Sequence, residues 1–382
     1  MEKKGNFKRI VIKIGSSTLT HKGGKLNLSR IDRLLRQIVD LKNQGREVLF
    51  VTSGAIGAGM GEMGLEKKPN LIKEQQAAAA VGQGQLIALY NKFLREYGEK
   101  GGQVLLTASD MEDRTRYLNA FNTLDTLLDY GVIPIINEND TVATEEIQFG
   151  DNDTLAARVA GLVEADLLIN LTDTKGLYNQ DPSRASDNLE LISRIDKITP
   201  EIEKIAGTEG SKVSTGGMQT KIEAAKIAIK SGIMMVIGPG YQENIILEII
   251  NMLENKNDFT IGTTFIPEKN SLPKRKQWFR FNLAARGRVK IDRGAEKALL
   301  NRGKSLLPGG ILETSGNYQR GDLVNVFNEH DVLIAKGLIN YSRQEVEQIK
   351  GHHSRDISEI IGYINQEEVL HRDNMVIVSS RE

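Results

Sequence analysis

Short apolar runs alternate with longer amphipathic segments over the first two-thirds of the chain. Six runs have the length and composition of buried strands: Ile10–Ile14, Glu47–Thr52, Gln103–Leu106, Ile133–Ile136, Asp166–Leu171 and Met234–Ile237. Between them, helical periodicity predicts helices over Ser29–Gln44, Leu71–Tyr97, Arg116–Tyr130, Asp153–Val163 and Thr220–Ser231. Ser29 is expected to cap the first helix and Gly45 to end it. This alternation predicts an α/β fold with an open, mainly parallel sheet sandwiched by helices.

The pattern changes near Gly262. A segment rich in proline and polar residues follows, and beyond Trp278 the apolar runs become short, β-like and separated by glycine. These later runs are Arg288–Ile291, Leu323–Phe327 and Leu333–Leu338, with one helix-like stretch at Gly294–Asn301. We therefore expect an α/β domain over residues 1–265, a linker over 266–277 and a small, mostly β domain over 278–382.

Charge supports this division. The net charge is zero, but eleven Lys or Arg and only two acidic residues lie between Leu272 and Lys304, so this segment carries +9 and the remainder −9. The chain has no cysteine, which excludes a disulfide scaffold, a thiolate nucleophile and a cysteine zinc site. No segment approaches the roughly 20 apolar residues that cross a membrane, and we expect a cytoplasmic protein.

Four glycine-containing turns follow predicted strands or precede predicted helices. They are Lys13–Ser17, Thr52–Ala55, Gly150–Asp153 and Thr215–Met218. In an open α/β sheet, ligands bind beyond the carboxyl ends of the strands, and helix N-termini there favour anions. One such turn is more often an ordinary chain reversal, and neither a GxxxxGK[ST] nor a GxGxxG motif is present. The set of four nevertheless indicates a polyanionic ligand such as a nucleotide.

Two lysines accompany these turns. Lys13 interrupts an apolar strand, where an unpaired charge is costly, and Lys221 follows the fourth turn at the start of a helix. His21 is the only histidine before residue 300, which argues against Ser-His-Asp chemistry in the first domain. A kinase that acts on a carboxylate needs no base, because its nucleophile is already an anion. It needs positive charge at the phosphoryl group, which two lysines and Mg²⁺ supply.

The first domain resembles the amino-acid kinase family, and within it the enzymes that phosphorylate glutamate in the first step of proline biosynthesis. The resemblance rests on VIKIGSSTLT, FVTSGAIGAGM, LLTASDMEDRTRYLNAFNTL, IPIINENDTVATEEIQFGDNDTLAARVA, LINLTDTKGLYNQDP and STGGMQTKIEAAKIA. The segments GRVKIDRGAEKALLNRGKSLLPGGI, RGDLVNVF, AKGLINYS and EVLHRDN resemble a PUA domain. Ser16-Ser17 and Ser214 depart from the commoner family pattern, but the backbone that would bind phosphate is retained.

This resemblance implies a role for each matching residue. Lys13 and Lys221 would stabilise the transferring phosphoryl group, and Asp153 would orient both lysines or cap its helix. Ser53, Asp140 and Asn152 would hold glutamate, with Asp140 facing the ammonium and Ser53 and Asn152 offering hydrogen bonds to carboxylate. ATP would contact a set drawn from three turns: Lys13, Gly15, Thr172, Asp173, Thr215, Gly216, Gly217, Met218, Gln219, Thr220 and Lys221. Mg²⁺ would be carried on the nucleotide, so no protein metal ligand is assigned.

The resemblance also implies partners. Proline would inhibit by feedback, because Leu105–Ala120 resembles the segment near the family's glutamate and proline site. We expect a homo-oligomer, either a dimer or a tetramer. We also expect functional coupling to glutamyl phosphate reductase and no contact with a membrane.

Two alternatives remain open at this point. The first is another acceptor within the family: N-acetylglutamate, aspartate, carbamate or UMP. Asp140 argues against N-acetylglutamate, which has no ammonium. The second is RNA binding through the basic segment of the C-terminal domain. Aromatic residues, which stack on bases, make up only 5% of the chain, and this scarcity argues against RNA binding.

Overall fold

The computed structural model of the chain describes residues 7–21, 25–142, 152–180, 189–206, 217–256, 258–267 and 285–378. The chain divides into two compact units, Met1–Asn270 and Ser271–Glu382, and each is described here by itself. The linker expected at 266–277 falls almost entirely outside the described residues, so its limits stay a prediction.

The first unit is built on an eight-stranded sheet of order β3-β4-β2-β1-β5-β7-β8-β6. Its strands are β1 (Arg9–Ile14), β2 (Glu47–Val51), β3 (Gly101–Leu106), β4 (Ile133–Glu138), β5 (Leu167–Thr172), β6 (Arg194–Ile195), β7 (Met234–Pro239) and β8 (Thr263–Phe265). Neighbouring strands are parallel except β7 and β8, which pair antiparallel. The predicted open, mainly parallel sheet is confirmed, while the short strands β6 and β8 were not predicted.

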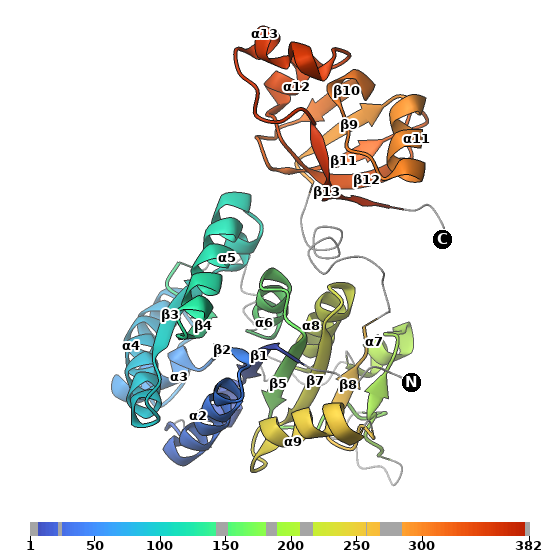
Figure 1. Cartoon of the computed structure of the whole chain (residues 1–382). Coiled ribbons are helices and arrows are strands. Elements are labelled where there is room, and N and C mark those ends of the chain that lie inside the picture. Colours follow the sequence, from blue (N-terminus) through green and yellow to red (C-terminus); the bar gives the residue numbers. More distant parts are fainter. Residues whose placement is uncertain are drawn as a thin grey trace. The chain divides into compact units, whose positions relative to one another are not determined.

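Helices cover both faces of this sheet (Figure 1). The helices are α1 (Ser16–Leu19), α2 (Leu28–Asn43), α3 (Ala55–Glu62), α4 (Ile72–Glu96), α5 (Arg114–Asp129), α6 (Asn152–Leu162), α7 (Pro200–Ala206), α8 (Met218–Lys230) and α9 (Ile245–Asn251), with short turns η1 (Ala108–Met111) and η3 (Met252–Lys256). Contacts place α2, α4 and α9 on one face and α5, α6 and α8 on the other. None of the helices among the described residues is both long and apolar enough to cross a bilayer.

The start of α2 corrects one prediction. Asn27, not Ser29, caps this helix, and its side chain accepts a hydrogen bond from the backbone N–H of Arg30. Ser29 lies inside the first turn, where its hydroxyl is not in the capping position. Gly45 follows the helix with a positive φ of 84°, a conformation that favours glycine, and the predicted end of the helix is confirmed.

Alternation along β1 sends its side chains to the two faces of the sheet. Ile10, Ile12 and Ile14 belong to the main hydrophobic core, which they share with residues of α2 and α9. Lys13 therefore points to the opposite face, toward α6. The lysine that interrupts the apolar run thus leaves the main core intact.

Helices α3 and α4 approach with almost no space between their backbones. A Cβ at Gly59 would lie 1.8 Å from the carbonyl oxygen of Ala78, and one at Gly82 would lie 1.9 Å from that of Ala55. Glycine is therefore required at both positions. Gly54, which precedes α3, has φ 92° and caps the helix by its conformation. The contact fixes α3, and with it the turn that follows β2.

The second unit contains a five-stranded sheet of order β10-β9-β11-β12-β13. Its elements are β9 (Gly287–Ile291), α11 (Arg293–Arg302), η4 (Pro308–Gly310), β10 (Ile311–Gly316), β11 (Leu323–Phe327), β12 (Leu333–Ile339), α12 (Arg343–Ile349), η5 (Ser354–Asp356), α13 (Ile357–Ile361) and β13 (Leu370–Ile377). The sheet has its own core, which includes Val289, Val324 and Tyr341. The predicted small, mostly β domain is confirmed.

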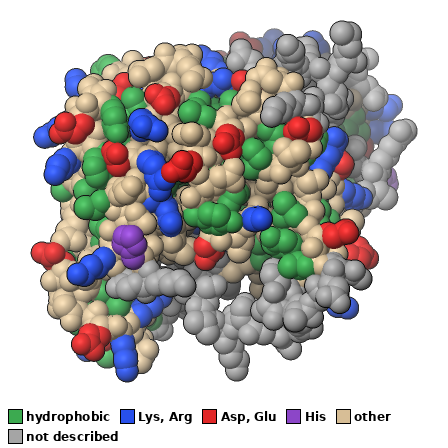
Figure 2. Space-filling model, turned by 90° about the horizontal axis from the view of Figure 1, so that it is seen from below, with side chains coloured by type: hydrophobic (Ala, Val, Ile, Leu, Met, Phe, Trp, Pro, Cys, Tyr) green, Lys and Arg blue, Asp and Glu red, His purple; other side chains and the backbone are tan. Residues whose placement is uncertain are grey.

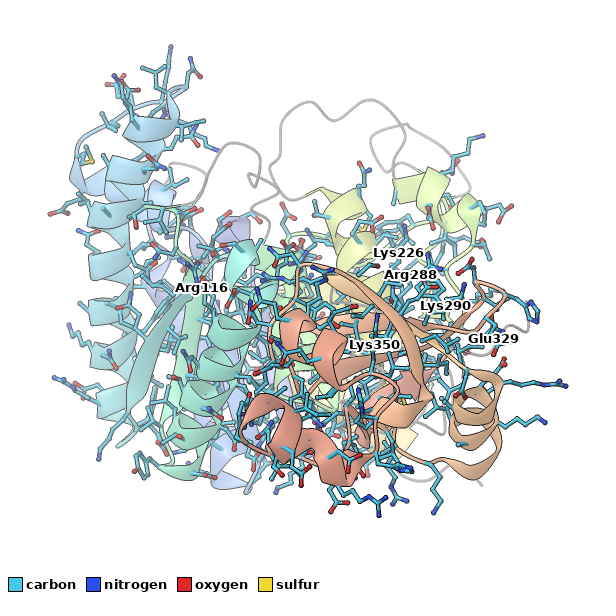
Figure 3. The ribbon with its side chains drawn as sticks, turned by 90° about the horizontal axis from the view of Figure 1, so that it is seen from above. Arg116, Lys226, Arg288, Lys290, Glu329 and Lys350 are labelled. Carbon is cyan, nitrogen blue, oxygen red and sulfur yellow. The ribbon has the colours of Figure 1, made fainter. Side chains whose placement is uncertain are left out.

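Part of the basic segment is compensated within this unit. Arg288 and Lys290 of β9 (Figure 3) both contact the carboxylate of Asp331. Arg288 also lies over the ring of Phe327. Figure 2, a view onto the first unit, shows Lys and Arg side chains among Asp and Glu side chains rather than in one continuous patch. Arg288 and Lys290 are thus paired within the second unit, and RNA binding through the basic segment stays a prediction.

Candidate active site

The carboxyl ends of four adjacent strands, β4, β2, β1 and β5, meet at one edge of the sheet. A cavity of about 380 Å³ opens there. Its described lining is Lys13, Gly15, Ser16, Ser17, Thr20, Ser53, Gly54, Ala55, Ile56, Gly57, Met60, Lys68, Asn137, Glu138, Asp140, Asn152, Thr172, Asp173 and Lys221. This is the edge at which a doubly wound sheet binds its ligands.

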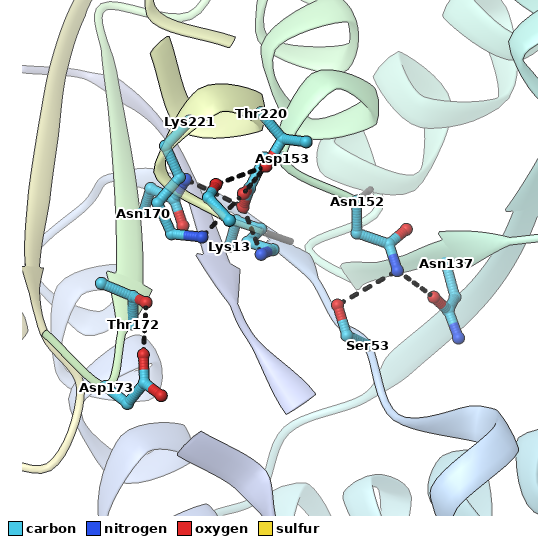
Figure 4. A network of polar contacts seen from close by, with 11 residues as sticks. Lys13, Ser53, Asn137, Asn152, Asp153, Asn170, Thr172, Asp173, Thr220 and Lys221 are labelled. Atoms are coloured by element: carbon cyan, nitrogen blue, oxygen red, sulfur yellow. Dashed lines mark hydrogen bonds and ion pairs between the residues drawn. The ribbon is translucent and has the colours of Figure 1, made fainter. Parts of the chain in front are cut away.

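Asp153 connects the two predicted lysines (Figure 4). Its Oδ1 binds Lys13 Nζ, and its Oδ2 lies 3.0 Å from Lys221 Nζ. Two neutral donors also reach it: Asn170 Nδ2 at 2.9 Å and Thr220 Oγ1 at 3.3 Å. The carboxylate thus holds both ammonium groups in place from one central position.

The register of the sheet explains this convergence. Lys13 of β1 pairs with Asn170 of β5, so both side chains rise from the same face at the same level. Asp153 enters from the first turn of α6, which packs on β1, and Lys221 from the first turn of α8, which packs on α6. Four segments far apart in the sequence are needed to build the cluster.

The cluster is buried and brings two lysines to one aspartate. Asp153 is 0% exposed, Lys13 3% and Lys221 5%. Both lysines also line the cavity. Positive charge that is held in place at the wall of a poorly hydrated cavity favours a bound anion. The cluster is therefore suited to a phosphoryl group.

An amide network lies on the other side of the cavity (Figure 4). The backbone N–H of Glu138 donates to Asn137 Oδ1, which fixes the orientation of that amide. Asn137 Nδ2 donates to Gln83 Oε1, and Asn152 Nδ2 donates to both Asn137 Oδ1 and Ser53 Oγ, each at 3.1 Å. Both N–H groups of Asn152 are therefore used inside the protein.

The side-chain oxygen of Asn152 differs from its N–H groups. Asn152 Oδ1 is buried and accepts no hydrogen bond from any residue that the structure describes. An unpaired buried acceptor costs free energy, which a donor on the ligand would recover. Asn152 lines the cavity, so this acceptor suits an ammonium donor on a ligand, and the contact of Asn152 with a substrate carboxylate stays a prediction.

Asp140 lies in the turn after β4, on the cavity wall. Burial raises the pKa of its carboxyl to about 6, and the positive charge of Lys68 offsets part of this rise. Lys68 lines the same cavity from the loop between α3 and α4. Above pH 6 the carboxylate offers a partner for an ammonium in the cavity that Asn152 also lines.

The residues predicted to bind ATP are distributed unevenly. Gly15 caps α1. Thr172 ends β5 and is joined to Asp173, which follows it, by a hydrogen bond of 3.1 Å; all three residues line the cavity. Gly217 caps α8 and is followed by Met218 and Gln219, which do not line the cavity. Thr220 reaches Asp153 instead. Thr215 and Gly216 lie outside the described residues.

Two further points differ from the sequence analysis. Helix α6 begins at Asn152, so Asp153 lies within its first turn and is not the cap that the alternative interpretation made it. Asn170 and Lys68 were missed. Asn170 carried a usable signal, because, like Lys13, it interrupts a buried apolar strand; Lys68 carried none, since it stands in a polar loop.

No group of three or more His, Cys, Asp or Glu side chains suited to a metal ion occurs among the described residues. The carboxylate of Asp153 is already engaged by two lysines.

Comparison with known proteins gives consistent matches over both units. The amino acid kinase family matches residues 8–239, and the PUA domain matches residues 287–361. Glutamate 5-kinase of Thermoanaerobacter sp. (strain X514) is 52% identical over 98% of this chain and 99% of its own length. Glutamate 5-kinase of Moorella thermoacetica is 49% identical over 97% and 96%. The solved structure of UMP kinase from Bacillus anthracis matches with a TM-score of 0.46 and 13% identity, over 69% of this chain and 97% of that one.

Proposed function

The chain belongs to the amino acid kinase family, and from that premise we propose that it transfers the γ-phosphoryl group of ATP to the side-chain carboxylate of L-glutamate. The product is L-glutamyl 5-phosphate, and the reaction is the first step of proline biosynthesis. Relatives named glutamate 5-kinase, about half identical over nearly the whole chain, support this acceptor.

The distribution of charge in the cavity is the observation that carries the proposal. Lys13 and Lys221 lie on one side, held by Asp153. Asp140 and the unpaired oxygen of Asn152 offer partners for an ammonium elsewhere on the wall. A ligand with an ammonium at one end and an anionic reacting group at the other matches this arrangement. N-acetylglutamate and UMP have no ammonium and would leave Asp140 uncompensated.

The lysine pair accounts for the chemistry. An oxygen of the glutamate side-chain carboxylate attacks the γ-phosphorus of ATP, the bond to the bridging oxygen breaks, and ADP leaves. The nucleophile is already ionised, so no side chain has to remove a proton. Lys13 and Lys221 stabilise the charge that develops on the transferring group, and Asp153 keeps them in position before the substrates arrive.

The remaining partners follow from the same geometry. Gly15, Thr172 and Asp173 lie where the nucleotide would extend beyond the lysines. Mg²⁺ carried on the phosphates would neutralise part of their charge, and no protein side chain is assigned to it. The contacts of Thr215 to Gln219 with ATP rest on the family resemblance.

An acyl-hydroxamate assay tests the proposal. With Mg²⁺-ATP, L-glutamate and hydroxylamine, the protein is expected to form glutamyl hydroxamate and ADP. N-acetylglutamate, aspartate, carbamate and UMP serve as competing acceptors in the same assay. Turnover of any of these with none on glutamate would reject the assignment.

Regulation by proline is part of this proposal. Proline shares the α-carboxylate and the amino nitrogen of glutamate, so it suits the same side of the cavity. Inhibition by millimolar proline that is relieved by raising glutamate is expected, and unchanged activity would contradict it.

Oligomeric assembly and coupling to the next enzyme are also part of this proposal. Exposed apolar side chains on and beside α3 and α4, including Met63, Leu71 and Val81, support a dimer or tetramer, which light scattering would detect. An acyl phosphate is reactive toward water, which favours its direct use by glutamyl phosphate reductase. The use of ATP and glutamate supports a cytoplasmic location.

A further inference from the structure

The cavity must distinguish two oppositely charged groups on one carbon of the substrate. The α-ammonium and the α-carboxylate of glutamate share the Cα, so a selective site offers an anion and a cation side by side. Asp140 and Asn152 Oδ1 supply partners for the ammonium. The partner of the α-carboxylate is not assigned by the chemistry described above.

Three cations line the cavity among the described residues: Lys13, Lys68 and Lys221. Two of them bind the carboxylate of Asp153, and they face the phosphoryl group. Lys68 belongs to a different wall, formed by α3 and the loop that follows it, together with Ile56 and Met60. It is therefore the cation that is separate from the transfer chemistry.

Lys68 and Asp140 are electrostatic neighbours. The Lys68 ammonium lowers the pKa of Asp140, against the larger effect of burial, so the two charges act on each other across the cavity. Two groups bonded to one Cα lie within about 2.5 Å of it by ordinary bond lengths. An ammonium beside Asp140 therefore keeps its α-carboxylate in the cavity that Lys68 also lines.

We propose that Lys68 is a specificity-determining residue that binds the α-carboxylate of the amino-acid substrate, paired with Asp140 for the ammonium. This inference rests on the proposed glutamate kinase function and deepens it. The neutral competitors for the same group are the Ser53 hydroxyl and the backbone N–H groups at the start of α3, which also reach the cavity. A full charge gives Lys68 the larger effect, because hydrogen bonds between ions are stronger than those between neutral groups.

The test compares two substrates that differ only at this group. L-glutamate and its α-amide both carry the side-chain carboxylate and the ammonium, but the α-amide lacks the α-carboxylate charge. In the hydroxamate assay, wild-type protein is expected to prefer glutamate in kcat/KM. Lys68→Gln is expected to lower kcat/KM for glutamate about 10-fold, mainly through KM, because it removes a charge-assisted contact with the substrate. Its turnover of the α-amide stays within about 2-fold of wild type.

Two further variants control for structural damage. Lys68→Arg keeps the charge and is expected to retain most of the preference for glutamate. Lys67→Gln removes a neighbouring exposed lysine of the same loop that does not line the cavity, and it is expected to behave as wild type. A preference in Lys68→Gln as large as in wild type would overturn the inference and assign the α-carboxylate to Ser53 or to the backbone of α3.

A binding measurement separates this inference from the proposed function. Calorimetric titration of glutamate and of its α-amide gives the same preference as a ratio of Kd values, without any turnover. Glutamate that binds to wild type but is not phosphorylated would reject the kinase proposal, and a collapsed ratio in Lys68→Gln would still support Lys68. Failure of wild type to bind glutamate would overturn both.

Discussion

Lys221 Nζ lies 3.0 Å from Oδ2 of Asp153, with only 6% of the lysine side chain and none of the aspartate side chain exposed. The other oxygen of the same carboxylate binds Lys13. One buried anion therefore positions two cations at the wall of the cavity. Most of the predictions below test consequences of this arrangement or of the pocket beside it.

Removing either lysine should reduce the rate of the chemical step. Lys13→Met and Lys221→Met are expected to lower kcat by about 10²–10³-fold, because each removes a preorganised positive charge from the transition state. The KM for glutamate should change far less. Lys226→Met is the matched control, since Lys226 belongs to the same helix as Lys221 (Figure 3) but pairs with Glu203 and Glu223. A Lys221→Met protein with normal kcat would show that this lysine has no catalytic role.

Asp153→Asn should weaken the fold as well as the activity. It leaves two buried lysines without their shared anion, and loss of one member of a buried ion pair costs about 3–5 kcal/mol. Urea denaturation should therefore show a lower free energy of unfolding of that order. The double variant Asp153→Asn with Lys221→Met removes one of the stranded charges and should recover part of the loss. Additive destabilisation in the double variant would contradict the pairing.

Asp140 predicts a pH dependence of glutamate binding. Its pKa is raised to about 6, chiefly by burial, so the carboxylate becomes protonated as the pH falls through 6 and loses its attraction for the ammonium. The kcat/KM for glutamate should fall over this range. Because phosphate groups also titrate near pH 6, the decisive comparison is with Asp140→Asn, which should lack the step that belongs to Asp140. Parallel pH profiles for wild type and Asp140→Asn would argue against a role of Asp140 in this pH dependence.

The raised pKa of Asp140 also makes the stability of the fold depend on pH. The sign of this dependence is opposite to that for an ion-paired carboxylate. A carboxyl with a folded pKa above its unfolded value binds more protons in the folded state, so stability decreases as the pH rises from about 4 to 6. Asp140→Asn should be more stable than wild type above pH 6, and the difference should disappear as the pH falls toward 4. Equal stability at pH 7 would show that burial does not disfavour this charge.

The contact between α3 and α4 should not accept a methyl group. Gly82→Ala would place Cβ 1.9 Å from the Ala55 carbonyl oxygen, so α3 must move, at a cost of about 1–3 kcal/mol, and the KM for glutamate should rise with the displaced cavity wall. Gly84→Ala is the control on the same helix, where nothing lies within 4 Å. Thermal unfolding should show that Gly84→Ala is as stable as wild type or more stable. Equal effects of the two substitutions would refute the close approach.

A chain that ends at residue 272 should fold and phosphorylate glutamate. Every residue assigned to the site precedes residue 222, and the first unit has its own sheet and core. Purified residues 1–272 should match the kcat of the full chain, with proline response and oligomer size compared in parallel. A folded but inactive truncation would show that the second unit contributes to the active enzyme.

Much of the fold and part of the site could be predicted from sequence, for local reasons. Lys13 was identified because a charge inside an apolar strand needs a partner, although the partner lay 140 residues away. Asn170 carried the same signal in β5 and was overlooked. The antiparallel strand β8 has only three residues, too few for a periodicity to emerge. The sequence of α3 is rich in glycine, which predicts a turn rather than a helix. Only the packing of this segment on α4 makes it a helix.

The sequence by itself determined six strands and five helices of the first unit in their order, the glycine turns after the strands and the change of architecture near Gly262. These depend on hydrophobic periodicity and backbone freedom, which act over a few residues. The tertiary structure decided which groups meet: the register that sets Lys13 beside Asn170, the approach of Asp153 to Lys221 across 68 residues, and the network that engages the amide nitrogen of Asn152. These depend on long-range packing, in which each side chain's orientation is fixed by partners that no local pattern can specify.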